Sequence, residues 1–247
     1  MIEAELENFI KQIDLPKNQI LFLHVRLKGI ANDLSYDILS KKIISLFEDL
    51  YSPKTILVPT FTYAYTKTGV YNKMESPAEV GRFSEEIRKM YDWECRTNNP
   101  VFNVIDTKKY FTKYNLKEET AFGDDSLMHL LHEMGHIVIN LNVENFISTY
   151  LHFLEYHYNV PYRYIKSFPG EVILSTENTK QVNYKYHVRD LDADTSWDRN
   201  MIKETLADAN GLRVYNSGGI ELSWIDSEKM ESILGKKLTR DKNFLLG

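Results

Sequence analysis

Cysteine is almost absent from this sequence, and its scarcity excludes a fold held together by disulfides. The 247 residues contain one cysteine, Cys95, so no internal disulfide can form. This composition fits a reducing compartment, and we expect a cytoplasmic protein. No feature around Cys95 predicts a lowered thiol pKa, so we interpret it as a free surface thiol and not as a nucleophile.

Long apolar runs are missing as well. No stretch approaches the roughly 18 consecutive apolar residues that suggest a membrane-spanning helix. The N-terminal segment MIEAELENFIKQIDLP has neither the basic nor the apolar region of a signal peptide, and its pattern predicts a short amphipathic helix. We therefore expect neither export nor a membrane partner.

An excess of positive charge is the third absence. Thirty basic residues face thirty-five acidic ones, giving a formal net charge of -5, which argues against a nucleic acid partner. Repeats, low-complexity segments and Pro/Gly/Ser-rich linkers are also missing. With 43% apolar residues the chain can bury a continuous core, so we predict one domain over residues 1–247.

Apolar runs and helical patterns alternate in the N-terminal half. Residues 19–25 (QILFLHV) predict a strand, residues 34–50 a helix with one apolar face, and residues 55–58 a second strand. Such a unit favours a parallel pair of strands packed against helices. Residues 62–74 have no clean period and predict a long loop, whereas residues 79–91 predict a helix.

The C-terminal half predicts a different arrangement. Residues 126–135 predict a short helix that ends at a glycine, and a strand follows. Residues 145–158 predict another helix, entered through Ser148 or Thr149, which are both good N-cap residues. Residues 171–188 predict an antiparallel hairpin, and residues 197–210 a long helix before a last strand and a short helix. The fold class is therefore α/β: a single mixed domain with a partly parallel sheet and an antiparallel C-terminal part.

One conspicuous motif is a poor candidate for chemistry. His132-Glu133-Met134-Gly135-His136 matches the H-E-x-x-H pattern of zinc peptidases. That chemistry needs both histidines on one uninterrupted helix, whereas Gly135 predicts a helix end and His136 the start of a strand. His129 lies on the same short helix, so adding it as a third ligand does not make a zinc site more plausible. A zinc hydrolase is therefore only a distant alternative, and we expect no metal.

A stronger candidate lies further along the chain. Thr149, His152 and Glu155 are spaced three residues apart, so they line one side of a helix that starts here. A carboxylate that holds one imidazole nitrogen leaves the other free to accept a proton. Backbone N–H groups at a helix start can stabilise an oxyanion. Spacing alone leaves open a solvated His–Glu pair without a function.

The order of motifs supports the catalytic interpretation. It resembles the aminoglycoside 3-N-acetyltransferase family over roughly residues 15–165. The matching segments are LHVRLKGIA from Leu23, VPTFTY from Val58, SPAEVGRFSEEIRK from Ser76, RTNNP from Arg96, FGDDS from Phe122 and STYLHFLE from Ser148. The last of these resembles the family's Thr-x-x-His-x-x-Glu motif.

The resemblance implies a CoA-dependent N-acyltransferase with acetyl-CoA or another acyl-CoA as cosubstrate. Two departures fall in loops that help to hold CoA in the family: Val25 and Arg26 replace serines, and Asn99 replaces a histidine. Arg26 can still favour an anionic group. The cofactor-binding residues that the resemblance implies are His24, Arg26, Lys28, Gly29, Arg96, Thr97 and Ser126.

Direct transfer of the acyl group to an amine is the reaction that the resemblance implies. His152 is then the general base, Glu155 orients it, and Thr149 with nearby N–H groups stabilises the oxyanion. A homologue that only binds CoA or sugar is the non-catalytic alternative.

The acceptor amine is harder to predict. We favour an amino sugar, which a nucleotide diphosphate can carry, with stacking and phosphate contacts from a loop that contains Tyr63, Tyr65, Tyr71, Lys67 and Lys73. The alternative is an aminoglycoside antibiotic, for which Asp190, Asp192, Asp194 and Asp198 offer an acidic surface. The candidate substrate contacts are Tyr63, Tyr65, Asp192 and Asp194. A homodimer is left open.

Overall fold

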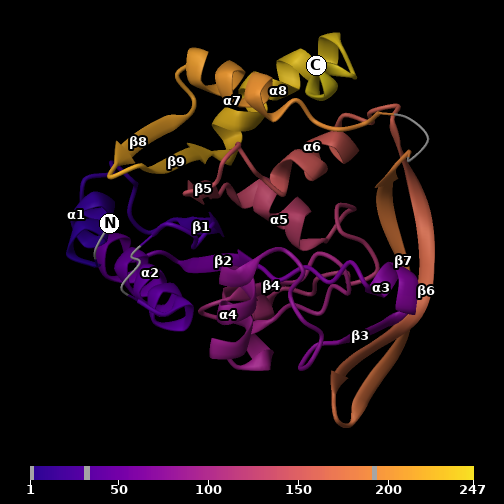
Figure 1. Ribbon diagram of the computed structural model, residues 1–247. Helices are drawn as coiled ribbons and strands as arrows, with labels where there is room; N and C mark the ends of the chain where they lie inside the picture. Colours follow the sequence, from indigo (N-terminus) through magenta and orange to yellow (C-terminus); the bar gives the residue numbers. More distant parts are fainter. Residues whose placement is uncertain (1–2, 31–33, 191–193) are drawn as a thin grey trace.

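A six-stranded sheet runs through the centre of the molecule (Figure 1). The computed structural model describes residues 3–30, 34–190 and 194–247. The strand order is β4-β2-β1-β5-β9-β8; β1 pairs in parallel with β2 and β5, and the other neighbours pair antiparallel. The strands are β1 (Ile20–Val25), β2 (Thr55–Pro59), β4 (Val104–Asp106), β5 (Ile137–Leu141), β8 (Arg213–Ser217) and β9 (Ile220–Asp226). The predicted mixed α/β fold class, with antiparallel strands towards the C-terminus, is confirmed.

Helices cover both faces of this sheet. Because successive strand residues point to opposite faces, Phe22 of β1 packs into one core and its neighbours Leu21 and Leu23 into another. One face carries α1 (Glu3–Lys11), α2 (Tyr36–Tyr51) and α4 (Arg82–Met90). The other carries α5 (Leu127–Met134), α6 (Tyr150–His157), α7 (Arg199–Asp208) and α8 (Ser227–Arg240). The described residues contain no helix that is long and apolar enough to cross a membrane.

A second sheet stands at one side of the molecule, at the right of Figure 1. It consists of β3 (Val70–Asn72) and a long antiparallel hairpin of β6 (Arg163–Ser175) and β7 (Asn178–Arg189). The hairpin was predicted, but it starts earlier than expected. The predicted loop at residues 62–74 contains the short helix α3 (Tyr65–Thr68) and β3. Strand β3 forms by pairing with β6, about one hundred positions away, which local periodicity cannot indicate.

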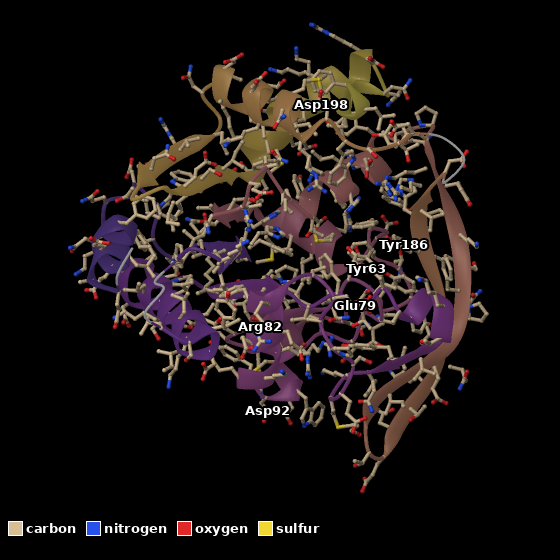
Figure 2. All side chains as sticks on the ribbon, in the orientation of Figure 1. Tyr63, Glu79, Arg82, Asp92, Tyr186 and Asp198 are labelled. Atoms are coloured by element: carbon tan, nitrogen blue, oxygen red, sulfur yellow. The ribbon has the colours of Figure 1, made fainter. Side chains whose placement is uncertain are left out.

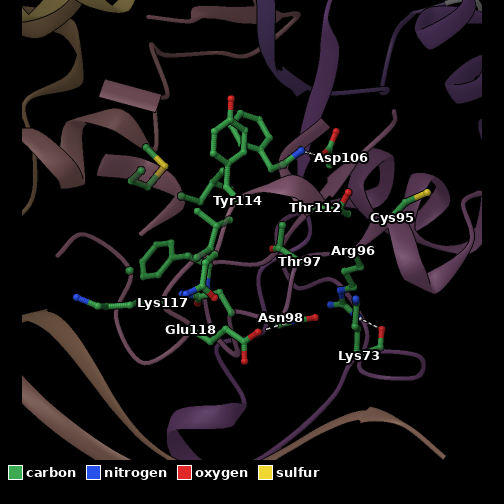
Figure 3. Close-up of a pocket in the computed structure, with 18 of the residues that line it drawn as sticks. Lys73, Cys95, Arg96, Thr97, Asn98, Asp106, Thr112, Tyr114, Lys117 and Glu118 are labelled. Atoms are coloured by element: carbon green, nitrogen blue, oxygen red, sulfur yellow. Dashed lines mark hydrogen bonds between the residues drawn. The ribbon is translucent and has the colours of Figure 1, made fainter. Parts of the chain in front are cut away.

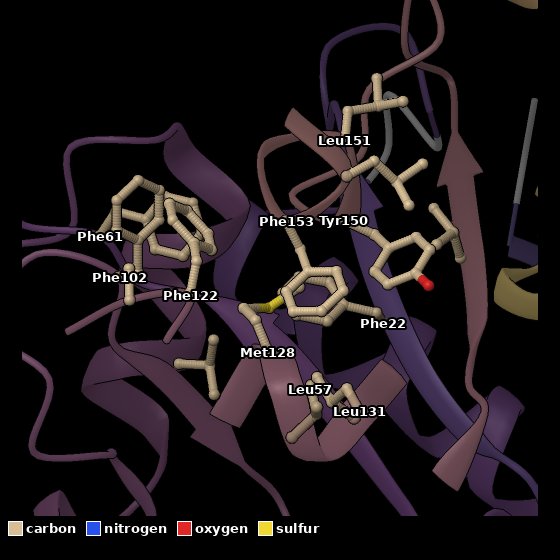
Figure 4. Close-up of a cluster of buried hydrophobic side chains, with 14 of the residues drawn as sticks. Phe22, Leu57, Phe61, Phe102, Phe122, Met128, Leu131, Tyr150, Leu151 and Phe153 are labelled. Carbon is tan, nitrogen blue, oxygen red and sulfur yellow. The ribbon is translucent and has the colours of Figure 1, made fainter. Parts of the chain in front are cut away.

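Aromatic side chains form the core next to α6 (Figure 4). The ring of Phe102 lies 4.9 Å from the rings of both Phe61 and Phe122, and 5.9 Å from that of His152. On the inner side of α6 the rings of Tyr150 and Phe153 stack at 5.5 Å. This dense packing fixes the orientation of α6 and of the side chains that it carries.

Helix α6 starts at Tyr150 with Thr149 at its N-cap position, one of the two entry points that the sequence predicted, although the helical pattern extended back to Asn145. The preceding segment is held differently: the side chain of Asn140 on β5 donates to the carbonyl of Ile147 and accepts from its N–H. The Asn140 side chain thus pairs with the backbone of Ile147 as a neighbouring strand would, and it fixes the segment to the end of β5. Cys95, expected at the surface, is buried, and burial raises the pKa of its thiol. It lies in the short 3₁₀ helix η1 (Trp93–Cys95); η2 (Tyr110–Lys113) and η3 (Phe244–Leu246) are similar turns.

Candidate active site

The His152 and Glu155 side chains form a hydrogen-bonded pair one turn apart on α6. His152 Nδ1 lies 3.0 Å from Glu155 Oε2. The carboxylate is completely buried, whereas the imidazole is 23% exposed. Since an ionised carboxylate can only accept, Nδ1 carries the proton and Nε2 keeps its lone pair. The arrangement that the spacing predicted is therefore present, with one ring nitrogen held and the other free.

Two residues distant in sequence complete the surroundings of Glu155. Trp197 Nε1 donates to Glu155 Oε1 at 2.7 Å, and Arg163 Nε forms an ion pair with Oε2 at 2.6 Å. Burial alone raises the pKa of Glu155, but the hydrogen bond from His152 and the charges of His152 and Arg163 outweigh it and hold that pKa below its usual value. The carboxylate therefore stays ionised at neutral pH.

The imidazole is tuned towards its neutral form. Burial lowers the pKa of His152, and the opposing hydrogen bond to Glu155 does not restore it. The indole of Trp197 lies 4.5 Å from the imidazole, centroid to centroid, and limits its rotation. A neutral, oriented imidazole is the state that a general base needs before reaction.

Thr149 is the residue before the first turn of α6. It is 5% exposed, and its hydroxyl does not cap the helix. The helix N–H of Tyr150 is instead capped by the hydroxyl of Ser148 at 3.2 Å. The Thr149 hydroxyl is therefore free of a capping role and lies in the lining of the cleft that also contains His152.

Two clefts open beside His152. The first, which we call the β1/α4 cleft, has a volume of about 570 Å³ and lies between the end of β1 and the start of α4. Basic side chains line it: Arg26, Lys28, Arg82 and Arg199. Arg26 forms an ion pair with Glu144, and Arg82 with Glu86 at 2.6 Å. The cleft therefore combines cationic groups with the N-terminal turn of a helix, both of which favour phosphate.

The second, which we call the hairpin cleft, has a volume of about 830 Å³ and is bounded by β6, β7 and the segment before α7. Five residues line both clefts: Tyr63, Asn145, His152, Trp197 and Arg199. Figure 2 shows Tyr63 and Tyr186, two residues of the hairpin cleft, on the side of the molecule that faces the hairpin. The imidazole thus lies where two separate binding spaces meet, an arrangement suited to reaction between two bound molecules.

Known proteins share this architecture. The sequence model of the aminoglycoside 3-N-acetyltransferase family matches residues 35–238. The chain belongs to this family. It is therefore a CoA-dependent N-acetyltransferase with an acyl-CoA as cosubstrate, as the motif order predicted. No curated protein sequence matches it significantly.

Solved structures with the same fold are distant in sequence. AAC-IIIb in binary complex with CoASH has 16% identity and a TM-score of 0.75, with 97% of each chain covered. AAC(3)-Xa has 13% identity and a TM-score of 0.77, covering all of this chain and 94% of its own. The YokD protein from Bacillus subtilis has 16% identity and a TM-score of 0.74, with 98% of this chain and 94% of its own covered. At these identities the likeness concerns the fold.

Several residues predicted for this acetyltransferase line the clefts. The β1/α4 cleft contains His24, Arg26 and Lys28, together with Thr149. His24 is 9% exposed and its Nε2 has no hydrogen-bond partner in the described residues. Burial and the nearby His136 lower the pKa of His24 to about 3, so its ring is neutral.

Arg96 and Thr97, predicted to bind the cofactor, lie elsewhere. They line a separate cavity of about 240 Å³ (Figure 3). Arg96 is 1% exposed, and its guanidinium donates to Asn103, to Thr62 and to three backbone carbonyls. The Thr97 hydroxyl accepts from the N–H of Val104. Every N–H donor of Arg96 is thus used inside the fold. We therefore assign neither Arg96 nor Thr97 to the proposed cofactor site.

Other predicted residues also have structural places. Ser126 is buried and caps α5 by accepting from the N–H of His129. Gly29 adopts a positive φ of 87° in the turn after β1 and does not line the cleft. The predicted substrate contact Tyr65 is fully buried, and its hydroxyl donates to the carbonyl of Phe168. Of the predicted substrate contacts, Tyr63 alone lines the hairpin cleft within the described residues.

The described aspartates of the predicted acidic surface, Asp190, Asp194 and Asp198, do not line the hairpin cleft. Asp194 is exposed and accepts from the N–H of Ser196, and Asp198 caps α7 by accepting from Met201. Asp192 lies outside the described residues. No aspartate or glutamate lines the hairpin cleft among the residues that the structure describes.

The HEMGH segment breaks where the sequence predicted. Helix α5 ends at Met134, Gly135 has a positive φ of 71°, and His136 is buried with its Nδ1 facing the carbonyl of Leu131. A different group, from α5, α6 and α8, brings three ligand atoms within 4.8 Å of one another: His132, His157 and Glu231. It lies outside both clefts. The zinc-peptidase geometry therefore does not form in this segment.

Sequence reasoning missed Trp197 and Arg163, which hold Glu155, and Arg199, which lines both clefts. They lie well beyond the Thr-x-x-His-x-x-Glu motif, and no spacing relates them to it. A tryptophan beside an acidic run was the one local signal, and it carried no information on its partner.

Proposed function

We propose that this chain transfers an acyl group from acyl-CoA directly to the amine of an amino sugar, with His152 as general base. This proposal rests mainly on the position of the His152–Glu155 pair at the junction of the two clefts. One cleft then receives the acyl-CoA and the other the amine, so that both are bound before reaction. Acyl-CoA is a cytoplasmic metabolite, so we also propose that the enzyme works in the cytoplasm.

The β1/α4 cleft suits the acyl-CoA. Arg26, Lys28 and Arg82 offer positive charge to its phosphates, and Gly81 lies at the start of α4 with a φ of 117° and open space around it. The first N–H groups of a helix have no intrahelical partner and bind anions readily. The cosubstrate supplies an activated thioester carbonyl.

His152 then moves the protons. Its Nε2 accepts the proton of the acceptor amine while the amine nitrogen bonds to the thioester carbonyl carbon. The C–S bond breaks as the tetrahedral intermediate collapses, and the imidazolium returns a proton to the leaving sulfur. Glu155 stabilises the transient imidazolium because its carboxylate stays ionised.

Thr149 supports the oxyanion in this proposal. The residue lines the same cleft as His152, at the start of α6. A donor aimed at the developing negative charge lowers the barrier without reorganisation during the reaction.

An aminoglycoside acceptor is the second candidate, because the family takes its description from that reaction and similar structures hold a gentamicin and sisomicin. Their chains have 15% and 16% identity to this one, with TM-scores of 0.71 and 0.75. Thiol release from acetyl-CoA in the presence of amino sugars or aminoglycosides separates the two candidates.

The test of the base is His152→Ala. Loss of a positioned general base typically costs about 10²- to 10⁴-fold in rate. We expect a loss in that range while acetyl-CoA still binds in a calorimetric titration. Near-normal turnover by the folded variant would contradict the assignment. Thr112→Ala, on an exposed turn outside both clefts, is the matched control.

A further inference from the structure

The hairpin cleft has an unusual charge for a site that receives an amine. Four of its lining side chains are basic, Arg163, Lys166, Arg189 and Arg199, and none of the described ones is acidic. The protein as a whole has a net charge of -5, so this concentration of positive charge is local. A polycationic acceptor would meet like charges in this cleft, and no described carboxylate lines it to compensate them.

Among the described residues, one of these cations has a charged partner inside the fold. Arg163 is 7% exposed and forms its ion pair with Glu155. Lys166, Arg189 and Arg199 form no ion pair with any residue that the structure describes, and all three are exposed. Within the described part of the chain, the cleft therefore presents up to three positive charges that no ion pair compensates.

The hairpin contributes cations to this cleft at two places. Lys166 on β6 lies opposite Tyr186 on β7, on the strand face that also carries Tyr164 and Phe168. Arg163 and Arg189 lie opposite each other at the open end of the hairpin, where both line the cleft. Lys166 Nζ lies 5.4 Å from the centre of the Phe168 ring, which keeps the ammonium along the cleft wall. The wall thus alternates cationic and aromatic groups.

Five further lining residues are aromatic. Tyr63, Tyr164, Phe168, Tyr186 and Trp197 border the cleft, and Tyr164 is 53% exposed. Exposed rings of this kind suit stacking against a base or the apolar face of a sugar. Cations for phosphate beside rings for a base are the features that a nucleotide carrier requires.

We propose that the hairpin cleft takes an anionic acceptor: an amino sugar joined to phosphate, which Lys166 and Arg189 bind while the amine reaches His152. This inference deepens the proposed function and rests on it for the place of the amine. The phosphate can belong to a sugar phosphate or to a nucleoside diphosphate, and the aromatic wall favours the latter.

Binding to the CoA-saturated enzyme tests the proposal, because CoA then fills the other basic cleft. The probes are UDP, inorganic pyrophosphate and gentamicin, measured by calorimetry. We expect UDP to bind, and Lys166→Glu and Arg189→Glu each to weaken it by roughly tenfold or more, since a charge-assisted contact is lost and a repulsive one is gained. Pyrophosphate that binds as tightly as UDP identifies phosphate alone as the determinant, whereas tighter UDP binding identifies the nucleoside as well.

The matched control is Lys185→Glu. Lys185 is exposed on β7 and lies opposite Ser167, and it does not line the cleft, so the same charge change there leaves UDP binding unaltered. The proposal is overturned if neither UDP nor pyrophosphate binds, if the two cleft variants bind UDP like Lys185→Glu, or if gentamicin binds the unmodified enzyme more tightly than UDP.

This outcome is separable from that of the proposed function. His152→Ala keeps UDP binding, because the imidazole is not one of the cationic contacts, and it loses turnover. If the variant keeps its turnover, the base assignment fails while the anion site stands. If turnover is lost but the charge reversals leave UDP binding unchanged, the anion site fails and the base assignment stands.

Discussion

Glu155→Gln is the substitution that separates charge from shape at the reaction centre. Glutamine has nearly the same volume as glutamate but carries no charge, and its amide offers donors as well as an acceptor. The buried carboxylate now holds the protons of His152 and Trp197 and faces Arg163 at 2.6 Å. In the variant the amide NH₂ can donate to His152 Nδ1, which places the imidazole proton on Nε2 and removes the base.

The magnitude follows from these contacts. A wrong tautomer in a hydrogen-bonded histidine lowers turnover by up to about 10⁴-fold in the serine protease example, so we expect a loss of about 10²- to 10⁴-fold. Removing one partner of a buried ion pair costs about 3–5 kcal/mol, and Arg163 is 7% exposed. For a chain of this size each kcal/mol corresponds to about 2–4 °C in Tm, so the expected decrease is roughly 6–20 °C.

Three measurements check this reasoning: steady-state turnover, thermal unfolding and the unfolding of the double variant Glu155→Gln/Arg163→Met. The double variant removes the orphaned charge, so it should unfold at a higher temperature than Glu155→Gln alone while remaining inactive. Wild-type turnover in Glu155→Gln would refute the role of the carboxylate. A double variant less stable than the single one would refute the ion-pair argument.

The remaining predictions concern other buried groups. Burial lowers the pKa of His24 to about 3 and that of His136 to about 4, from 6.5, so both add stability above pH ~6.5 that is lost as the pH falls. Together the two histidines should lower the free energy of unfolding at pH 5 by about 4 kcal/mol. Equal free energies of unfolding in urea at pH 5 and pH 7.5 would contradict this. Because burial lowers the pKa of His152, the rate should stay high as the pH falls to 6.5 and decrease only at lower pH. An acid limb of the pH–rate profile with its midpoint above pH 6.5 would contradict this. Arg96→Met should lose about 2–5 kcal/mol in unfolding experiments yet bind CoA with unchanged affinity, and a selective loss of CoA binding would restore its predicted role. Thr149→Val should lower kcat by roughly tenfold to 10²-fold with little change in acyl-CoA affinity, and an unchanged kcat would exclude its hydroxyl from oxyanion stabilisation.

The sequence predicted the elements whose signal is local. The run from Gln19 to Val25 and the run ended by Pro59 form parallel neighbours in the sheet, and Gly135 ends its helix as expected. The N-cap residue Thr149 was also predicted, but the helical pattern extended back to Asn145, and there a long-range contact decides: Asn140 holds the segment before α6 to β5. The short strand β3 escaped prediction for the same reason, since it exists through its pairing with β6.

The residues of the site also fall into those that local spacing predicts and those that depend on long-range contacts. The spacing of His152 and Glu155 places both on one turn of a helix, so their contact could be predicted from the residues themselves. Arg96 could not be placed, because an arginine that suits a phosphate equally suits a set of buried carbonyls, and the fold provides the carbonyls. Trp197 reaches Glu155 from 42 positions away, and no periodic pattern encodes that distance.

The residues proposed for proton transfer and those proposed for acceptor binding lie on different elements, which bears on specificity. The proposed base His152 and its partner Glu155 lie within one helical turn packed on an aromatic core, whereas Lys166 and Arg189, which we propose bind the phosphate of the acceptor, lie on the hairpin. Exposed hairpin residues such as Lys166 and Arg189 can change without disturbing that core, because they make no ion pair with the described residues and their backbone pairing depends on no particular side chain. On this proposal, substitutions confined to the hairpin residues of one cleft redirect the same reaction from cationic to anionic amines. Replacing both residues with glutamate should consequently shift binding away from UDP while leaving the pairing of His152 and Glu155, and hence the pH–rate profile, unchanged.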